Sequence, residues 1–151
     1  MPRVTRKRAV PAELEAVWAL ISDPYSLPRW WPKTMRVESV EGEGAEVQWT
    51  KVLGTAEGRG VRADFRRTEL IDNQRLSWEQ QIAGTPFERH LRRYAIDLSL
   101  DQTETGTTVT IAAVQTLRGL SRLGSPMMRR GQGALLEEAL DGIERALDGA
   151  E

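Results

Sequence analysis

The chain has 151 residues, of which 40% are hydrophobic and 28% charged, and its formal net charge is −1. This composition is typical of one soluble globular domain, and the near-zero charge argues against nucleic acid or an anionic membrane as a partner. The lack of cysteine excludes disulfides, thiolate metal sites and a cysteine nucleophile. We therefore expect a single cytoplasmic domain over residues 1–151, with no metal, no cofactor and no membrane span.

The first part of the chain predicts a strand followed by two short helices. Residues 2–10 alternate loosely between polar and apolar side chains, as in a strand. One apolar stripe at helical spacing follows, formed by Leu14, Val17, Trp18 and Ile21. Pro24 ends this helix, because the residue before a proline avoids the α-helical region. Asp23 is then expected to cap a second short helix, which Pro28 and Pro32 bound.

The middle of the chain predicts an antiparallel sheet. Six further segments alternate with a period of two, namely residues 35–41, 44–54, 59–71, 75–83, 88–101 and 106–117. Such alternation is typical of antiparallel strands with one face on the core and the other in water.

The last element is a long helix from about residue 121 to 147. Its apolar stripe consists of Leu136, Leu140, Ile143 and Leu147. Gly131 and Gly133 weaken the helical propensity of its first part. We therefore expect the turns around Met127 and Met128 to be looser than the rest, so that these methionines either gate a cavity or fill gaps in the core.

Four sequence segments together resemble a known family. They are Pro-Ala-Glu at 11–13 with Val17-Trp18, Ile-Ser-Asp-Pro at 21–24, Leu-Pro-Arg-Trp-Trp-Pro at 27–32, and the order of elements. The chain resembles the START-like helix-grip (SRPBCC) superfamily and, within it, the polyketide cyclase/dehydrase-like proteins. The resemblance implies an α+β fold, with a curved antiparallel sheet of six or seven strands around the C-terminal helix. Two short helices would follow the first strand.

The resemblance also implies a class of function. Members of this superfamily bind lipids, sterols, polyketides or aromatic metabolites in a cavity, and some are enzymes. Because the matching motif is a folding signature, the resemblance identifies no catalytic residue.

Strand alternation predicts which side chains face the C-terminal helix. They are Trp49, Lys51, Phe65, Arg67, Trp78, Gln80, His90, Arg92, Tyr94 and Gln115. Aromatic bodies with a few polar tips are typical of a ligand pocket, although polar residues at strand ends also reach solvent. The residues expected to contact a ligand are Trp31, Trp49, Phe65, Arg67, Trp78, Gln80, Gln115, Met127 and Met128. For Trp31, the alternatives are a place at the cavity mouth and packing in the core.

Three residues are candidates for catalysis. His90 is the only histidine, and histidine is the residue type suited to proton transfer at neutral pH. It either acts in the cavity or lies at an exposed loop edge. Arg92 and Tyr94 stand two residues apart on one strand face. A buried Arg92 needs a counter-charge, either Glu69 or Glu79 within the protein or a ligand carboxylate or phenolate.

Three functions are compatible with these patterns. The protein either binds a small hydrophobic molecule, or catalyses a cyclase/dehydrase-type reaction with His90, Arg92 and Tyr94, or binds another protein as a co-chaperone does. Homodimerisation remains open. Nucleic acid is not an expected partner, because alternation splits the arginines at 66–67 and 89–93 between the two sheet faces.

Overall fold

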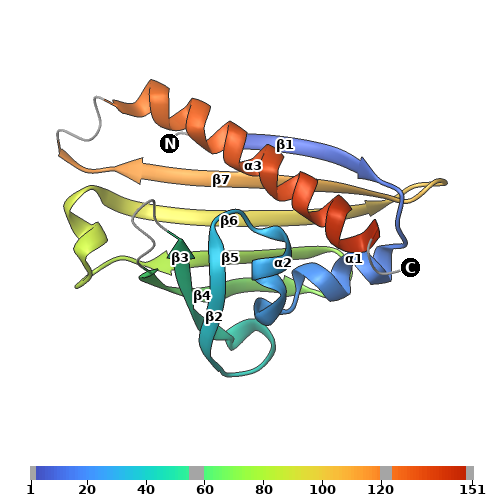
Figure 1. Cartoon of the computed structure of the whole chain (residues 1–151), viewed down its shortest axis with the longest axis horizontal. Coiled ribbons are helices and arrows are strands. Elements are labelled where there is room, and N and C mark those ends of the chain that lie inside the picture. The colour runs from blue at the N-terminus through green and yellow to red at the C-terminus, as the bar shows by residue number, and fades with distance from the viewer. Residues whose placement is uncertain (1–2, 55–59, 120–123, 149–151) are drawn as a thin grey trace.

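The computed structural model describes residues 3–54, 60–119 and 124–148. Its elements in chain order are β1 (Arg3–Val10), α1 (Leu14–Ile21), the 3-10 turn η1 (Pro24–Ser26), α2 (Leu27–Trp30), β2 (Thr34–Glu41), η2 (Gly44–Glu46), β3 (Gln48–Gly54), β4 (Gly60–Ile71), β5 (Arg75–Gln81), η3 (Pro86–Arg89), β6 (Leu91–Gln102), β7 (Thr107–Leu117) and α3 (Ser125–Asp148). Figure 1 shows α3 lying across the sheet, with α1 and α2 near its C-terminal end.

The sheet has seven antiparallel strands in the order β1-β7-β6-β5-β4-β3-β2. Every neighbouring pair from β2 to β7 is also consecutive in the sequence, whereas β1 pairs with β7 at the far edge. The segment α1-η1-α2 therefore connects the two edges of the sheet. This arrangement confirms the predicted α+β helix-grip fold and the two short helices after the first strand.

The core lies between the concave face of the sheet and α3. The predicted stripe of α3 supplies Leu136, Leu140 and Ile143, all with no exposed surface. They pack with buried sheet residues such as Ile96 and Ile111. Complete burial of each of these side chains stabilises the fold by about 1.5–3 kcal/mol. Within the described ranges, no helix is both long and apolar enough to cross a bilayer.

Close packing of α2 on α3 depends on a glycine. A Cβ atom at Gly142 would lie 2.2 Å from the carbonyl oxygen of Trp30. Because real Cβ atoms never approach so closely, only glycine lets the two helix backbones meet here. This contact fixes the position of α2, which ends with Trp30, and of Trp31 directly after it.

Arg8 links β1, one edge strand of the sheet, to α3. Its guanidinium forms ion pairs with Glu137 at 2.6 Å, with Glu144 at 3.4 Å and with Asp141. The hydrogen bond to Asp141 is the main cause of the raised pKa of Arg8. Three carboxylates from successive turns of one helix therefore meet one guanidinium from β1.

The segment between α1 and β3 follows the predictions with one change. The side chain of Asp23 accepts a hydrogen bond from the backbone N–H of Tyr25 at 3.0 Å, as expected of a cap. The strand predicted over 44–54 begins only at Gln48, since residues 44–46 form η2. Gly42 lies before this turn and Gly44 begins it, and both have positive φ angles, of 84° and 59°. The predicted start of the last helix, at residue 121, lies outside the described residues.

β-Bulges in β4 and in β6 change which face these two strands present. In β4, Arg67 pairs with Trp78 and Glu69 with Ser77, so Thr68 is an extra residue. Beyond it the alternation reverses, and Leu70 packs on the core. A second bulge lies in β6 between Leu91 and Arg93.

Candidate ligand cavity

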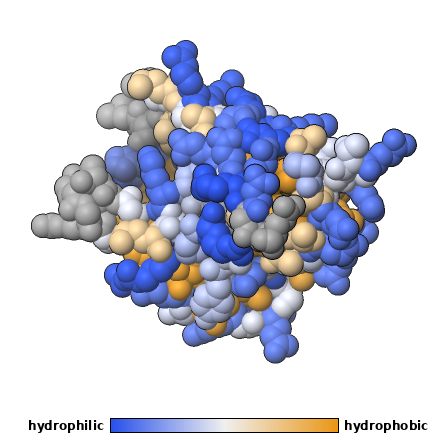
Figure 2. Space-filling model, turned by 45° about the vertical axis from the view of Figure 1, so that its right-hand side comes forward, coloured by the Kyte–Doolittle hydropathy of each residue, from blue (hydrophilic) through white to orange (hydrophobic). Residues whose placement is uncertain are grey.

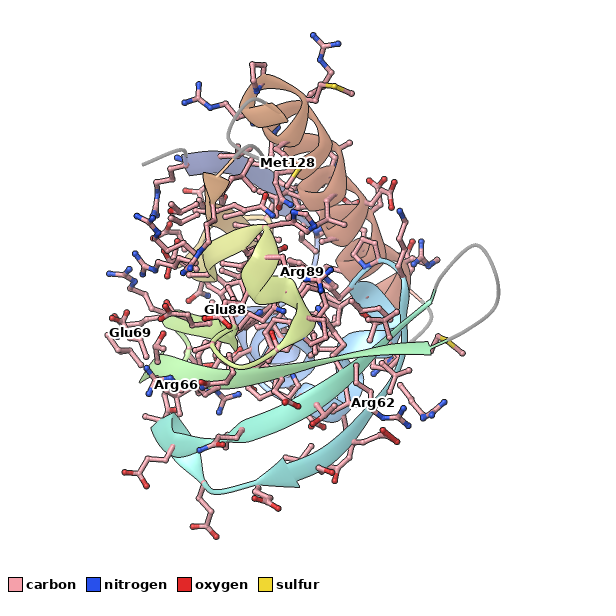
Figure 3. The ribbon with its side chains drawn as sticks, turned by 90° about the vertical axis from the view of Figure 1, so that its left-hand side faces the viewer. Arg62, Arg66, Glu69, Glu88, Arg89 and Met128 are labelled. Atoms are coloured by element: carbon pink, nitrogen blue, oxygen red, sulfur yellow. The ribbon has the colours of Figure 1, made fainter. Side chains whose placement is uncertain are left out.

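A cavity of about 930 Å³ opens at one end of the sheet. Figure 3 looks toward this end, where η3 lies between Met128 on α3 and Arg62 on β4. The cavity is lined by Gly60, Val61, Arg62, Pro86, Phe87, His90, Leu91, Gln115, Leu117, Gly124, Met127 and Met128. Its walls therefore come from the start of β4, from η3, from the ends of β6 and β7 that adjoin it, and from the start of α3.

The lining is mainly apolar. Leu91 and Leu117 are buried and form a small cluster with Ile82, separate from the main core, on which Phe87 and Met128 pack. The polar exceptions are few and come from Gln115, His90 and Arg62. An apolar cavity with a few polar groups is the common form of a small-molecule site.

Gln115 has an unsatisfied polar atom at the cavity. Its Oε1 is buried and has no hydrogen-bond partner among the described residues. A buried carbonyl oxygen without a partner costs about 1–3 kcal/mol, so it is a place where a water molecule or a ligand donor binds.

Four of the predicted site residues line the cavity, namely His90, Gln115, Met127 and Met128. Met128 is half-buried, whereas Met127 is 80% exposed at the rim. His90 follows η3 and is exposed, and its carbonyl accepts a hydrogen bond from the N–H of Arg118 at 2.8 Å. The prediction that His90 faces inward from a strand is thus wrong, because β6 begins one residue later. Its position matches the alternative of a loop edge, here beside the cavity.

The inward orientation predicted for Arg92 is wrong. Leu91 pairs with Leu117 and Arg93 pairs with Thr116, so Arg92 is the extra residue of the β6 bulge and is exposed. Leu91 takes the inward place instead. The expected partners of Arg92 are also engaged elsewhere: Glu79 pairs with Arg93 at 3.3 Å and Glu69 with Arg75 at 3.1 Å.

Tyr94 does face inward, next to Gln115 in the register of β6 and β7. Its hydroxyl lies 3.5 Å from Oε1 of Gln132 on α3, the outer limit of a hydrogen bond. Burial raises the pKa of Tyr94, so the phenol stays protonated across the physiological range. Tyr94 can therefore donate a hydrogen bond, but it does not line the large cavity.

The predicted aromatic contacts are buried but lie deeper than the cavity. Trp31, Trp49, Phe65 and Trp78 are each at most 4% exposed, and none of them lines the cavity. Trp31 and Trp49 pack edge-on against Trp78, with ring centroids 5.5 and 5.9 Å away. These rings belong to the main core between sheet and helix. Trp31 accordingly follows the core-packing alternative.

Arg67 ties elements together rather than lining the cavity. Its guanidinium donates to the carbonyl of Gly44 at 2.9 Å and to that of Ser22 at 2.5 Å. Burial lowers its pKa, and the charge of Asp23 opposes that effect. Arg67 thus joins β4 to η2 and to the end of α1.

Lys51 on β3 is the most unusual buried group. Its side chain is 3% exposed, and its Nζ lies 5.1 Å from the Trp31 ring centre and 4.6 Å from that of Phe65. Burial lowers the pKa of Lys51 to about 7. Gln80 is buried nearby, and its Nε2 lacks a hydrogen-bond partner among the described residues. Alternation places both side chains inward, but it could not show that Lys51 forms no ion pair with any residue that the structure describes.

Sequence reasoning missed most of the cavity wall. The missed residues are Gly60, Val61, Arg62, Pro86, Phe87, Leu91, Leu117 and Gly124. Val61 and Leu117 share the inward parity of their strands, so a signal for them existed. Pro86 and Phe87 belong to η3 and Leu91 faces inward because of the β6 bulge, whereas Gly60 and Arg62 come from the start of β4 and Gly124 precedes α3. Thr85 caps η3 and Pro86 begins it, and the Thr85 hydroxyl accepts a hydrogen bond from the N–H of Phe87 at 3.3 Å. This cap followed by a proline is a sequence signal for the turn.

Sequence comparison identifies the family. The family model described as "polyketide cyclase / dehydrase and lipid transport" matches residues 1–148. The chain belongs to this family. No curated protein sequence matches it significantly.

Solved structures of the same fold are numerous. TTHA0849 from Thermus thermophilus has a TM-score of 0.80 at 23% identity, and the match covers 99% of both chains. A START superfamily protein from Mycobacterium smegmatis has a TM-score of 0.79 at 15% identity, also over 99% of both. The di-domain ARO/CYC BexL of the BE-7585A biosynthetic pathway has a TM-score of 0.78 at 19% identity over 98% of this chain and 47% of BexL. At these identities the matches establish the fold alone.

Proposed function

We propose that this family member binds a small hydrophobic molecule in the cavity at the open end of the sheet. The observation that carries the proposal is the cavity itself, whose volume of about 930 Å³ suits a polycyclic or lipid-like molecule. Its apolar wall supplies affinity, while Gln115 and His90 supply the few polar groups that orient a ligand. Membership of a family described by both cyclase/dehydrase activity and lipid transport supports this ligand class.

Calorimetric titration with 2-naphthamide, a neutral aromatic probe, tests the proposal. Wild-type protein is expected to bind it saturably with a stoichiometry of one. Met128→Glu places a carboxylate on the cavity wall and removes apolar contact, so we expect at least tenfold weaker binding. Ala134→Glu is the matched control, because it adds the same charge to an exposed position of α3 outside the cavity.

Two results would contradict the proposal. One is equal binding by the two variants, which would place the probe elsewhere. The other is the absence of saturable binding by wild-type protein to the naphthyl probe.

A cyclase/dehydrase-type reaction in the same cavity is the second candidate. The observation that favours it is that His90, a residue able to transfer protons, lines the cavity. Conversion of a linear β-polyketone by wild-type protein, followed by mass spectrometry, tests it. His90→Ala should abolish conversion while probe binding persists, and Arg92→Ala, which alters an exposed residue, should leave conversion unchanged. Wild-type protein without conversion, or His90→Ala with full conversion, rejects this candidate.

The surface gives less support to the third hypothesis, a protein-binding module. The large exposed apolar side chains in the described ranges are spread over η1, β2, β4 and α3, namely Tyr25, Met35, Val61, Ile71 and Met127. The face in Figure 2 is covered mainly by hydrophilic side chains, with hydrophobic ones in small separate areas.

A further inference from the structure

The buried interior of the described residues is positively charged. Its buried charged side chains are Lys51 and Arg67, and no aspartate or glutamate is buried with them. Arg67 is accounted for, because it donates to two backbone carbonyls. Lys51 contacts two aromatic faces and forms no ion pair within the described part of the chain. Burial of an ammonium group without a carboxylate costs folding free energy, so Lys51 is expected to have a role other than stabilising the fold.

Two unsatisfied hydrogen-bond donors lie around the same phenylalanine ring. Trp49 Nε1 and Gln80 Nε2 are buried and have no partner among the described residues. In the register of the sheet, Phe65 pairs with Trp49 on one side and with Gln80 on the other. The Nζ of Lys51 lies 4.6 Å from the centre of the Phe65 ring. Three hydrogen-bond donors thus come from residues that contact Phe65 or pair with it in the sheet, one of them an amine.

This donor group lies deeper than the residues that line the proposed ligand cavity, on the two strands that pair with β4. Val61 lines the cavity, and the next inward position on β4 is Ala63, which pairs with Lys51. In the register of the sheet, Lys51 is therefore one inward position of β4 away from the cavity wall, and the side chain at that position is a small alanine. Gln80 is on β5, in the same part of the sheet as Tyr94 and Gln115, and Gln115 lines the cavity.

We propose that Lys51, Gln80 and Trp49 form an anion subsite at the inner end of the cavity, and that the ligand is a hydrophobic carboxylic acid. The proposal rests on the proposed ligand-binding function and adds the chemical class of the ligand. The apolar body lies against Val61, Leu117 and Met128, and the carboxylate receives hydrogen bonds from the three donors. The ligand supplies the counter-charge that the described residues do not provide.

Lys51 is suited to this task. The lowered pKa places the amine near the balance between its neutral and charged forms at neutral pH. A carboxylate within 4–6 Å favours the charged form, so binding of an acid draws the amine toward protonation.

The test compares 2-naphthoate with 2-naphthamide, which have the same aromatic body and differ in the charge of the head group. Titration calorimetry at pH 7 is expected to show wild-type protein binding the acid at least tenfold more tightly than the amide. Lys51→Met should remove this preference while changing amide affinity less than threefold. Lys7→Met is the matched control, since Lys7 is exposed on β1 and the same substitution there removes a lysine ammonium from the surface. Gln80→Leu, a second variant, removes one donor and should reduce the preference severalfold.

The outcomes separate this inference from the function on which it depends. Equal binding of acid and amide by wild-type protein, or a preference that survives in Lys51→Met, overturns the anion subsite and leaves hydrophobic binding intact. In that case the three donors would have only water as a hydrogen-bond partner. Failure of both probes to bind contradicts the proposed function and the subsite together. If Lys7→Met loses the preference for the acid to the same extent, the preference arises from general surface charge, and this result also overturns the subsite.

Discussion

Replacing Lys51 by methionine should stabilise the protein, and the gain should depend on pH. The pKa of Lys51 is about 7 in the fold, against the ordinary value of 10.5 for lysine. One pKa unit corresponds to about 1.4 kcal/mol, so charged Lys51 costs roughly 5 kcal/mol of folding free energy at low pH. The aromatic faces of Trp31 and Phe65 offset about 1–2 kcal/mol of this cost. Methionine has a similar length and fills the same space without a charge.

The sign follows from the direction of the shift. A lysine with a lowered folded pKa destabilises the fold fully below pH 7, and this effect fades as pH rises toward 10.5. We expect Lys51→Met to raise the free energy of unfolding by about 3–4 kcal/mol at pH 6 and by about 1–2 kcal/mol at pH 9.5. Urea denaturation of both proteins across this range measures it. A pH-independent difference, or a variant less stable than wild type at pH 6, would refute the reasoning.

Three further predictions test how the fold positions the cavity. Gly142→Ala should lower the free energy of unfolding by about 1–3 kcal/mol in urea denaturation, because its Cβ would clash with the Trp30 carbonyl. Its control, Gly131→Ala in open space on the same helix, should raise stability by about 0.5–1 kcal/mol, and the reverse order would contradict the packing described. Arg67→Met removes the donor that serves the carbonyls of Gly44 and Ser22 and should lower the thermal midpoint clearly, while calorimetric affinity for 2-naphthamide changes less than threefold; a larger loss of affinity would make Arg67 a ligand contact. Tyr94→Phe removes only a 3.5 Å hydrogen bond and should cost less than about 1 kcal/mol in urea denaturation, so a loss above 2 kcal/mol would show that the hydroxyl has a stronger partner.

The architecture could be predicted because local patterns agree with the global fold. The stripe Leu136-Leu140-Ile143 packs on the sheet as its spacing indicates. The alternation in β5 places Leu76, Trp78 and Gln80 inward as expected. Strand alternation and helical spacing reflect which residues are buried, so they predict the elements without knowledge of tertiary contacts.

The site was predicted less well because it depends on irregular structure. One extra residue in a β-bulge reverses the face of a strand, and no sequence signal fixed the bulge at Arg92. Alternation also shows which side chains point inward but not how much of the interior they fill. The aromatic rings around Trp78 fill the main core, so the free volume lies nearer η3. Phe87 belongs to η3 and His90 follows it. The sequence prediction left Phe87 unassigned and placed His90 in a strand.

Methionine methyl NMR during titration with 2-naphthamide tests the central claim most directly. The chain has four methionines, at positions 1, 35, 127 and 128, of which the last two line the cavity and Met35 lies on β2 outside it. Ligand binding in the cavity predicts saturable shifts of the Met127 and Met128 methyl signals, with the Met35 signal unchanged. Saturable shifts confined to Met35, or binding that moves neither Met127 nor Met128, would contradict the assignment of this cavity as the ligand site.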